Sequence, residues 1–162
     1  MKNESYLCLM DKIFEVIRAS RKALLSLVED LSTEQMNKIP VGFNNNLAWQ
    51  MGHLVVSQQV LCYKLSNNEL MIDPTLVDKY RNGSKPESFI SAEEIAQIKA
   101  YLLDTIDQLE QDLATDKFSN YTPYSISTYK GYRLEKIEDA IKFIVSHDGL
   151  HYGCSLMMRK FV

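Results

Sequence analysis

Histidines are the residues best suited to chemistry in this 162-residue chain, which has only three of them. His147 and His151 lie four residues apart near the C-terminus. Positions i and i+4 share one face of an α-helix, so both imidazoles can reach a single ion. His53 lies in another segment with helical periodicity. We hypothesise that the three side chains meet and bind a divalent transition metal, because three histidines with an open fourth position are typical of catalytic zinc sites.

The histidines also have a simpler interpretation. An imidazole on an apolar helical stripe is usually a buried neutral side chain with its own hydrogen-bond partners. The H-x-x-x-H pattern is also short. The metal site is favoured because every histidine of the chain falls on an apolar stripe. A metal-free bundle with hydrogen-bonded core histidines stays the alternative.

Apolar residues that recur every three or four positions predict four long helices, which would position these side chains. They cover about residues 4–31, 46–66, 91–115 and 134–160. His53 falls on the apolar stripe of the second helix, and His147 and His151 fall on that of the fourth. Capping-box patterns at 32–35 and 91–94 predict a short helical turn and the start of the third long helix.

Two connections separate these helices and complete the fold prediction. Residues 67–91 are rich in turn signals, with one short helix expected after Pro74, and their length indicates a crossover or a functional segment. Residues 116–133 hold four tyrosines without helical periodicity and are expected to form an ordered loop. The sequence therefore predicts an all-α fold, a four-helix bundle with a long crossover between helices 2 and 3, in one domain over residues 1–162.

Composition limits the classes of function. The chain is 46% hydrophobic and 24% charged, with a formal net charge of −3. Since no basic run exceeds a pair, nucleic acid and anionic membranes are not expected partners. No apolar stretch reaches the length of a membrane span, and we expect a soluble, cytoplasmic protein. Cys8, Cys62 and Cys154 fit neither a disulfide framework nor a zinc ribbon, which predicts free thiols.

Two stretches resemble the DinB/YfiT-like superfamily. Residues 46–54 (NLAWQMGHL) look like the N…W…GHL opening of its second helix, and residues 141–153 are similar to its H-x-x-x-H-x-G last helix. The resemblance implies a bundle, usually a homodimer, that binds zinc or nickel through His53, His147 and His151. It also implies that Gly153 allows close approach of a neighbouring helix. Members of this superfamily include metal-dependent hydrolases and transferases that use low-molecular-weight thiols, which implies a small-molecule substrate.

Two other metal sites share this spacing but are not expected here. A zincin needs H-E-x-x-H, whereas Asp148 stands in the glutamate position and no His, Asp or Glu follows His151. A ferritin-like di-iron site needs two Glu-x-x-His pairs on different helices. Gln50 occupies the position three residues before His53, so that pattern is incomplete.

Residues near the predicted ion each have two interpretations. Cys154, on the same stripe, is either a fourth ligand or activated thiolate, or a small buried hydrophobic residue. Trp49, one turn before His53, is either a wall of the site or an ordinary core aromatic. Asp148 is expected to face a neighbouring helix or solvent. The tyrosine-rich loop is either a cover for the site or an ordinary half-buried segment.

The resulting hypothesis is a metal-dependent enzyme that acts on a small molecule by thiol S-transfer or hydrolysis, with its catalytic residues unknown. The alternative is a non-catalytic metal-binding or stress-related bundle. An enzyme should leave solvent positions on the ion beside a pocket, whereas a structural site should be closed. Because a ligating imidazole must be neutral, the sequence also predicts that metal affinity falls below about pH 6.5.

Overall fold

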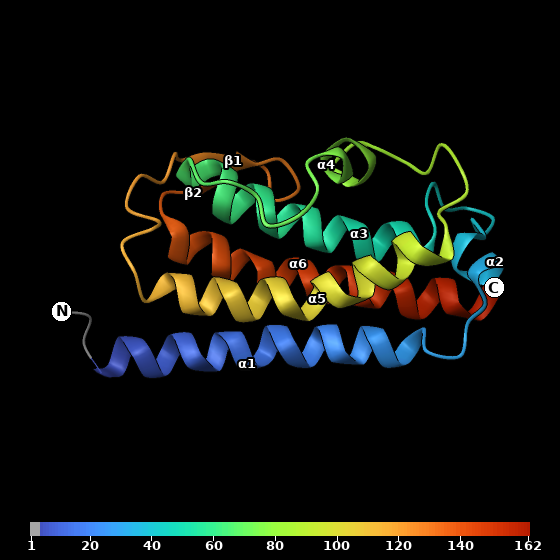
Figure 1. The fold of residues 1–162 in the computed structure, drawn as a ribbon, viewed down its shortest axis with the longest axis horizontal. Helices are drawn as coiled ribbons and strands as arrows, with labels where there is room; N and C mark the ends of the chain where they lie inside the picture. Colours follow the sequence, from blue (N-terminus) through green and yellow to red (C-terminus); the bar gives the residue numbers. More distant parts are fainter. Residues whose placement is uncertain (1–3) are drawn as a thin grey trace.

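The protein is a four-helix bundle in the computed structural model, which describes residues 4–162, with side chains from residue 9 onward (Figure 1). Its long helices are α1 (Glu4–Leu27), α3 (Leu47–Gln58), α5 (Ala92–Leu113) and α6 (Ile137–Met158). Both α1 and α3 pack against α5 and α6. Helices α1 and α6 run in one direction and α3 and α5 in the other (Figure 1). The connection from α3 to α5 therefore returns along the bundle, which confirms the predicted crossover.

Side-chain caps fix the starts of several helices where the sequence placed them. The side chain of Asn46 accepts the Trp49 N–H at 2.8 Å at the start of α3, and that of Ser91 accepts the Glu94 N–H at 3.2 Å at the start of α5. The short helix α2 (Thr33–Asn37) has the complete capping box predicted at Ser32. Helix α1 ends at Leu27, earlier than expected, because the following residues form tight i−3 turns.

Helix α3 continues without a break into a π-helical turn, Gln59–Tyr63, and a 3-10 turn, Lys64–Ser66. Asn67 then ends the segment in the left-handed conformation, with φ of 58°. The helical segment thus reaches residue 66, as the sequence predicted. The expected short helix after Pro74 is α4 (Thr75–Tyr80).

Residues 116–133 are not simply a loop, and this expectation was wrong. They contain most of an antiparallel hairpin, β1 (Tyr124–Ile126) and β2 (Tyr132–Leu134). The turn between the strands places Lys130 and Gly131 at positive φ. Strands of three residues are too short to produce a readable alternation of apolar and polar positions. Because β2 occupies Leu134, α6 begins at Ile137 rather than 134.

A polar layer crosses the middle of the bundle and separates two hydrophobic clusters. Each long helix contributes one buried member: Arg21, Gln58, Thr105 and Asp148. The Arg21 guanidinium donates to Asp148 Oδ2 at 2.8 Å, to Gln58 Oε1 at 3.1 Å and to the Leu102 carbonyl at 2.9 Å. Thr105 Oγ1 donates to Gln58 Oε1 at 2.7 Å. These bonds link all four long helices at one level.

Two further sequence expectations concern membranes and cysteines. Within residues 4–162, no helix has both the length and the apolar character required to cross a bilayer. Cys62 is buried and Cys154 is half-buried, and both are free thiols. The side chain of Cys8 lies outside the described part of the chain.

Candidate metal centre

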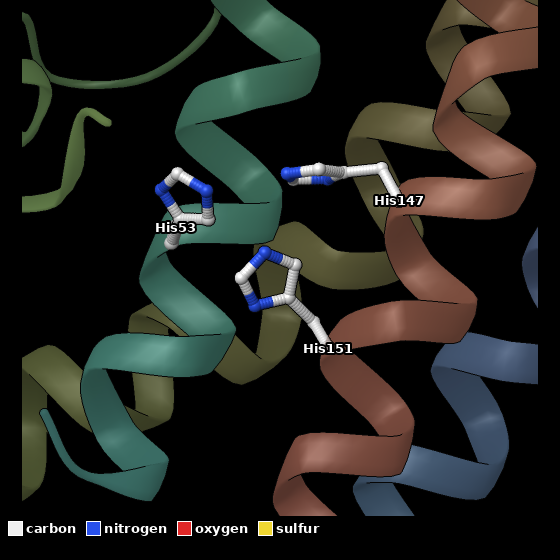
Figure 2. Close-up of side chains that lie close together, drawn as sticks. All are labelled: His53, His147 and His151. Atoms are coloured by element: carbon white, nitrogen blue, oxygen red, sulfur yellow. The ribbon is translucent and has the colours of Figure 1, made fainter. Parts of the chain in front are cut away.

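The structure brings His53, His147 and His151 together between α3 and α6 (Figure 2). One candidate ligand atom from each ring lies within 4.8 Å of the other two. The ring centroids are 4.5 Å apart for His147 and His151, and 4.7 and 5.1 Å from His53 to His151 and His147. Three residues that the sequence separates by up to 98 positions therefore form one cluster. Their role as metal ligands stays a prediction.

The ring of His53 is held from two sides. Its Nδ1 lies 2.7 Å from the Tyr80 carbonyl oxygen, which can only accept, so Nδ1 carries the proton and Nε2 keeps its lone pair. Ser57 Oγ lies 3.3 Å from this Nε2. Trp49 stacks on the ring with centroids 4.7 Å apart and planes 9° from parallel. The sequence allows this packing at Gly52, where an added Cβ would lie only 2.5 Å from the Tyr80 ring.

Gln50 orients the ring of His151. The amide nitrogen of Gln50 donates to Asn45 Oδ1 at 2.9 Å, which turns its Oε1 towards His151 Nδ1 in a short hydrogen bond. An amide oxygen accepts, so Nδ1 of His151 also carries the proton and Nε2 is left with its lone pair. Hydrogen bonds of this kind, behind a candidate ligand, fix the tautomer in which a histidine binds metal.

His147 differs from the other two histidines because no hydrogen bond within the described part of the chain holds its ring from behind. Its Nδ1 is buried and has no hydrogen-bond partner among the described residues. A buried polar nitrogen without a partner is costly, and native proteins rarely leave one unexplained. Figure 2 shows a ring nitrogen of His147 directed towards the other two histidines. Three imidazoles this close together could bind a metal ion.

Burial keeps all three rings neutral. Loss of solvent lowers the pKa of His147 to about 2, with a further contribution from its two histidine neighbours and Arg21. It lowers the pKa of His151 to about 3, aided by His53, and it also lowers the pKa of His53. Neutral imidazole is the form that binds metal. With these pKa values, the loss of metal affinity expected below about pH 6.5 would begin at lower pH, and the pH dependence of affinity stays a prediction.

A cavity of about 290 Å³ opens beside the cluster, with the three histidines in its wall. Trp49 lines it as well and also belongs to a hydrophobic core cluster, so both interpretations of this residue hold. The tyrosine-rich segment covers the site, as one of its two interpretations predicted, because Tyr124 and Ile126 of β1 also line the cavity. The cluster is thus open on one side to a space that can receive a small molecule.

Three sequence expectations near the cluster have different outcomes. Asp148 faces a neighbouring helix, one of the two expected positions: it is 1% exposed and points to Arg21 of α1. Cys154 belongs neither to the histidine cluster nor to the cavity wall, so no contact among the described residues supports it as a ligand. Gly153 is exposed, and an added Cβ would meet nothing within 4 Å. The expected close helix approach there is wrong, and such an approach occurs at Gly52 instead.

Residues around the cluster that the sequence reasoning missed include Arg21, Gln50 and Tyr80. Arg21 carried a readable signal, because it lies four residues after Ile17 and three before Leu24 and so shares their inward stripe. The role of Gln50 depends on the distance between α3 and α6, and that of Tyr80 on a backbone carbonyl. Neither has a side-chain pattern that sequence periodicity can reveal.

The chain is similar to a known protein family. The family model described as the DinB superfamily matches residues 17–155, a range that contains the three clustered histidines. No curated protein matches the chain.

Proposed function

The chain belongs to the DinB superfamily, and on that basis we propose that His53, His147 and His151 hold a divalent zinc or nickel ion for a reaction on a small molecule. The observation that carries this proposal is the position of the cluster in the wall of an open cavity. A structural zinc site is closed by four protein ligands, whereas a catalytic one has three and keeps a position free. The arrangement here supports the catalytic alternative.

The chain's own residues provide an orienting and partly dry surround. Gln50 and the Tyr80 carbonyl hold the protons of His151 and His53 on Nδ1, which leaves both Nε2 lone pairs available. Trp49 and Phe143 pack against the rings of His53 and His147. A divalent ion bound there would supply Lewis-acid chemistry, lowering the pKa of a thiol or water or polarising a substrate oxygen.

The cavity favours a thiol over water as the nucleophile. Among its described lining residues none is an aspartate or glutamate, and the carboxylate of Asp148 is directed to Arg21. No carboxylate of the described wall is therefore placed to take the proton from an attacking water, which would depend on the ion alone to lower its pKa. A thiol has a pKa near 8.5 and loses its proton to solvent far more readily than water does. We therefore favour S-transfer from a low-molecular-weight thiol, with hydrolysis as the second candidate.

Elemental analysis of protein purified without a metal-affinity column tests the ion directly. We expect about one equivalent of transition metal in the wild type, as for a three-histidine site. His53→Ala and His147→Ala should lose it and keep their helical circular dichroism, because two apolar clusters build the core. Cys154→Ala is the matched control, since this thiol on α6 lies outside the cluster and should not affect metal content.

Three outcomes would contradict the proposal. Absence of metal after incubation with zinc and with nickel would leave a bundle with buried histidines. Metal loss in Cys154→Ala alone would place the ion elsewhere. Global unfolding of His147→Ala would favour a structural ion.

Cobalt substitution distinguishes a catalytic site from a structural one. A thiol that reaches the ion in an open site should produce a sulfur-to-cobalt absorption band, and a closed site should produce none. The homodimer stays a prediction of the family resemblance.

A further inference from the structure

We infer that the cavity beside the histidines binds a small organic anion with an apolar body, and that Arg81 binds its negatively charged end. The inference rests on the proposed function in that it assigns a ligand class to the same cavity. It does not require the ion, however, because Arg81 is not one of the three candidate ligands.

The charge of the cavity wall is one-sided. Arg81 is the only charged side chain among the described residues that line it. An imidazole that binds a metal is uncharged. Three uncharged ligands would leave the positive charge of a divalent ion uncompensated. The charge of the ion would then add to the positive charge of Arg81. A cavity with positive charge and no acidic side chain attracts anions and disfavours cations.

The backbone around Arg81 is fastened to the histidine cluster. The carbonyl of the preceding residue, Tyr80, accepts the His53 Nδ1 proton at 2.7 Å. On the other side, the Ser84 N–H donates to the Arg81 carbonyl at 3.1 Å, and Trp49 Nε1 donates to Ser84 Oγ at 3.1 Å. These hydrogen bonds therefore fix the backbone position of Arg81 beside the cavity. The same hydrogen bonds orient His53 and Trp49.

The guanidinium of Arg81 is available to a ligand. Its carboxylate partner is Asp78, with Arg81 Nε and Asp78 Oδ1 3.5 Å apart and both side chains largely exposed. That separation is long for a hydrogen bond, and such exposed pairs contribute little. A ligand carboxylate can replace Asp78 in the planar, two-pronged geometry that arginine prefers. The neighbouring Asn82 and the hairpin residue Thr128 line the same cavity and add hydrogen-bonding groups.

The rest of the wall specifies the apolar body. Val60 and Leu61 from the π-helical turn, Ile126 from β1 and Phe143 from α6 all line the cavity. Consecutive residues of a regular α-helix point about 100° apart, and the wider π-turn is a distortion that often occurs at functional sites. These side chains suit a short aliphatic or aromatic group between the ion and the charged end of the ligand.

Calorimetric titration with hexanoate and with hexanol tests this assignment, because the two probes share a body and differ in charge. We expect wild-type protein to bind hexanoate more tightly than hexanol, both metal-free and zinc-loaded. Arg81→Gln should weaken hexanoate about fivefold, as for one exposed charge pair, and leave hexanol unchanged. Arg81→Lys should retain most of the preference. Arg133→Gln is the matched control, since Arg133 is an exposed arginine paired with Glu135 and does not line the cavity.

Zinc content measured on the same samples separates this inference from the proposed function. Arg81→Gln should keep the zinc of the wild type, because Arg81 is outside the histidine cluster. Protein that binds neither zinc nor nickel but keeps an Arg81-dependent preference for hexanoate would refute the proposed function and support the anion site. Equal binding of hexanoate and hexanol by the wild type would overturn the anion site. So would an anion preference that Arg81→Gln leaves unchanged, because the charge would then come from elsewhere.

Discussion

Replacing Arg21 with methionine should destabilise the bundle more than an ordinary substitution does, because it leaves Asp148 buried without its partner. Arg21 is 0% exposed and Asp148 1% exposed, with 2.8 Å between Nε and Oδ2. Arg21 donates hydrogen bonds to three acceptors. When Arg21 is replaced, one of these acceptors, Gln58 Oε1, still accepts from the Thr105 hydroxyl. Asp148 carries the negative charge, so the loss concentrates there. Removal of one partner of a buried ion pair costs about 3–5 kcal/mol, a large share of the roughly 5–15 kcal/mol that a domain has.

Urea unfolding of the metal-free protein, followed by circular dichroism at pH 7, measures this loss. The control is the double variant Arg21→Met with Asp148→Leu, which removes both charges and should recover most of the stability. Acidification provides a second check. Complete burial raises the pKa of the Asp148 carboxyl, and the Arg21 guanidinium opposes that rise. Without Arg21 the folded pKa rises further above the unfolded value, so the deficit of Arg21→Met should shrink as pH falls towards 4.

Two results would refute this reasoning. A loss below about 1 kcal/mol in Arg21→Met would mean that the ion pair is hydrated, since exposed pairs contribute about that much. A double variant as unstable as the single one would mean that Arg21 stabilises the bundle by packing or by its bonds to Gln58 and the Leu102 carbonyl, rather than by neutralising Asp148.

Two further predictions concern the histidines. Gln50→Leu should weaken metal binding about 10- to 100-fold, the usual effect of losing the partner of a ligating histidine. Gln50→Glu is the control, because it keeps an acceptor for His151. Competition with a chromophoric chelator measures both affinities, and equal affinities in wild type and Gln50→Leu would contradict the role of Gln50. Metal affinity should stay nearly constant from pH 8 to 5, because burial holds the pKa of His147 at about 2 and that of His151 at about 3. Over the same range the metal-free protein should lose stability below pH 6.5, by about 1.4 kcal/mol per pH unit for His147 and again for His151, because the unfolded chain takes up protons that the folded protein does not. Chelator competition and urea unfolding across this range check the two statements, and an affinity that fell tenfold between pH 6.5 and 5 would contradict the burial of the rings.

The helices and the histidine cluster could be predicted because their signals are local and periodic. Ser32, Asn46 and Ser91 cap their helices through residues only three positions away, so short stretches of sequence specify those starts. The i, i+4 spacing of His147 and His151 fixes their shared face in the same way. That His53 joins them followed from the inward stripe of its helix together with the family resemblance, rather than from spacing alone.

Features that depend on contacts between distant segments could not be predicted. The hairpin at 124–134 has strands of three residues, and its strand pairing is not encoded in a repeat. The acceptors behind His53 and His151 come from the Tyr80 backbone and from Gln50, 101 positions before His151. A polar side chain on an inward stripe, such as that of Arg21, breaks the apolar pattern in the sequence. Its hydrogen-bond partners on other helices can be identified only in the packed bundle.

The parallel stack of Trp49 on His53 gives this molecule an optical reporter of its own. Trp49 is the only tryptophan of the chain, so the indole fluorescence of the whole protein arises 4.7 Å from a candidate ligand ring. Nickel has partly filled d orbitals and quenches an excited indole at such range, whereas zinc has a filled d shell and does not. Emission intensity followed during titration with each metal would therefore report occupancy at His53 in real time, without a label, and would distinguish the two ions by the size of the response.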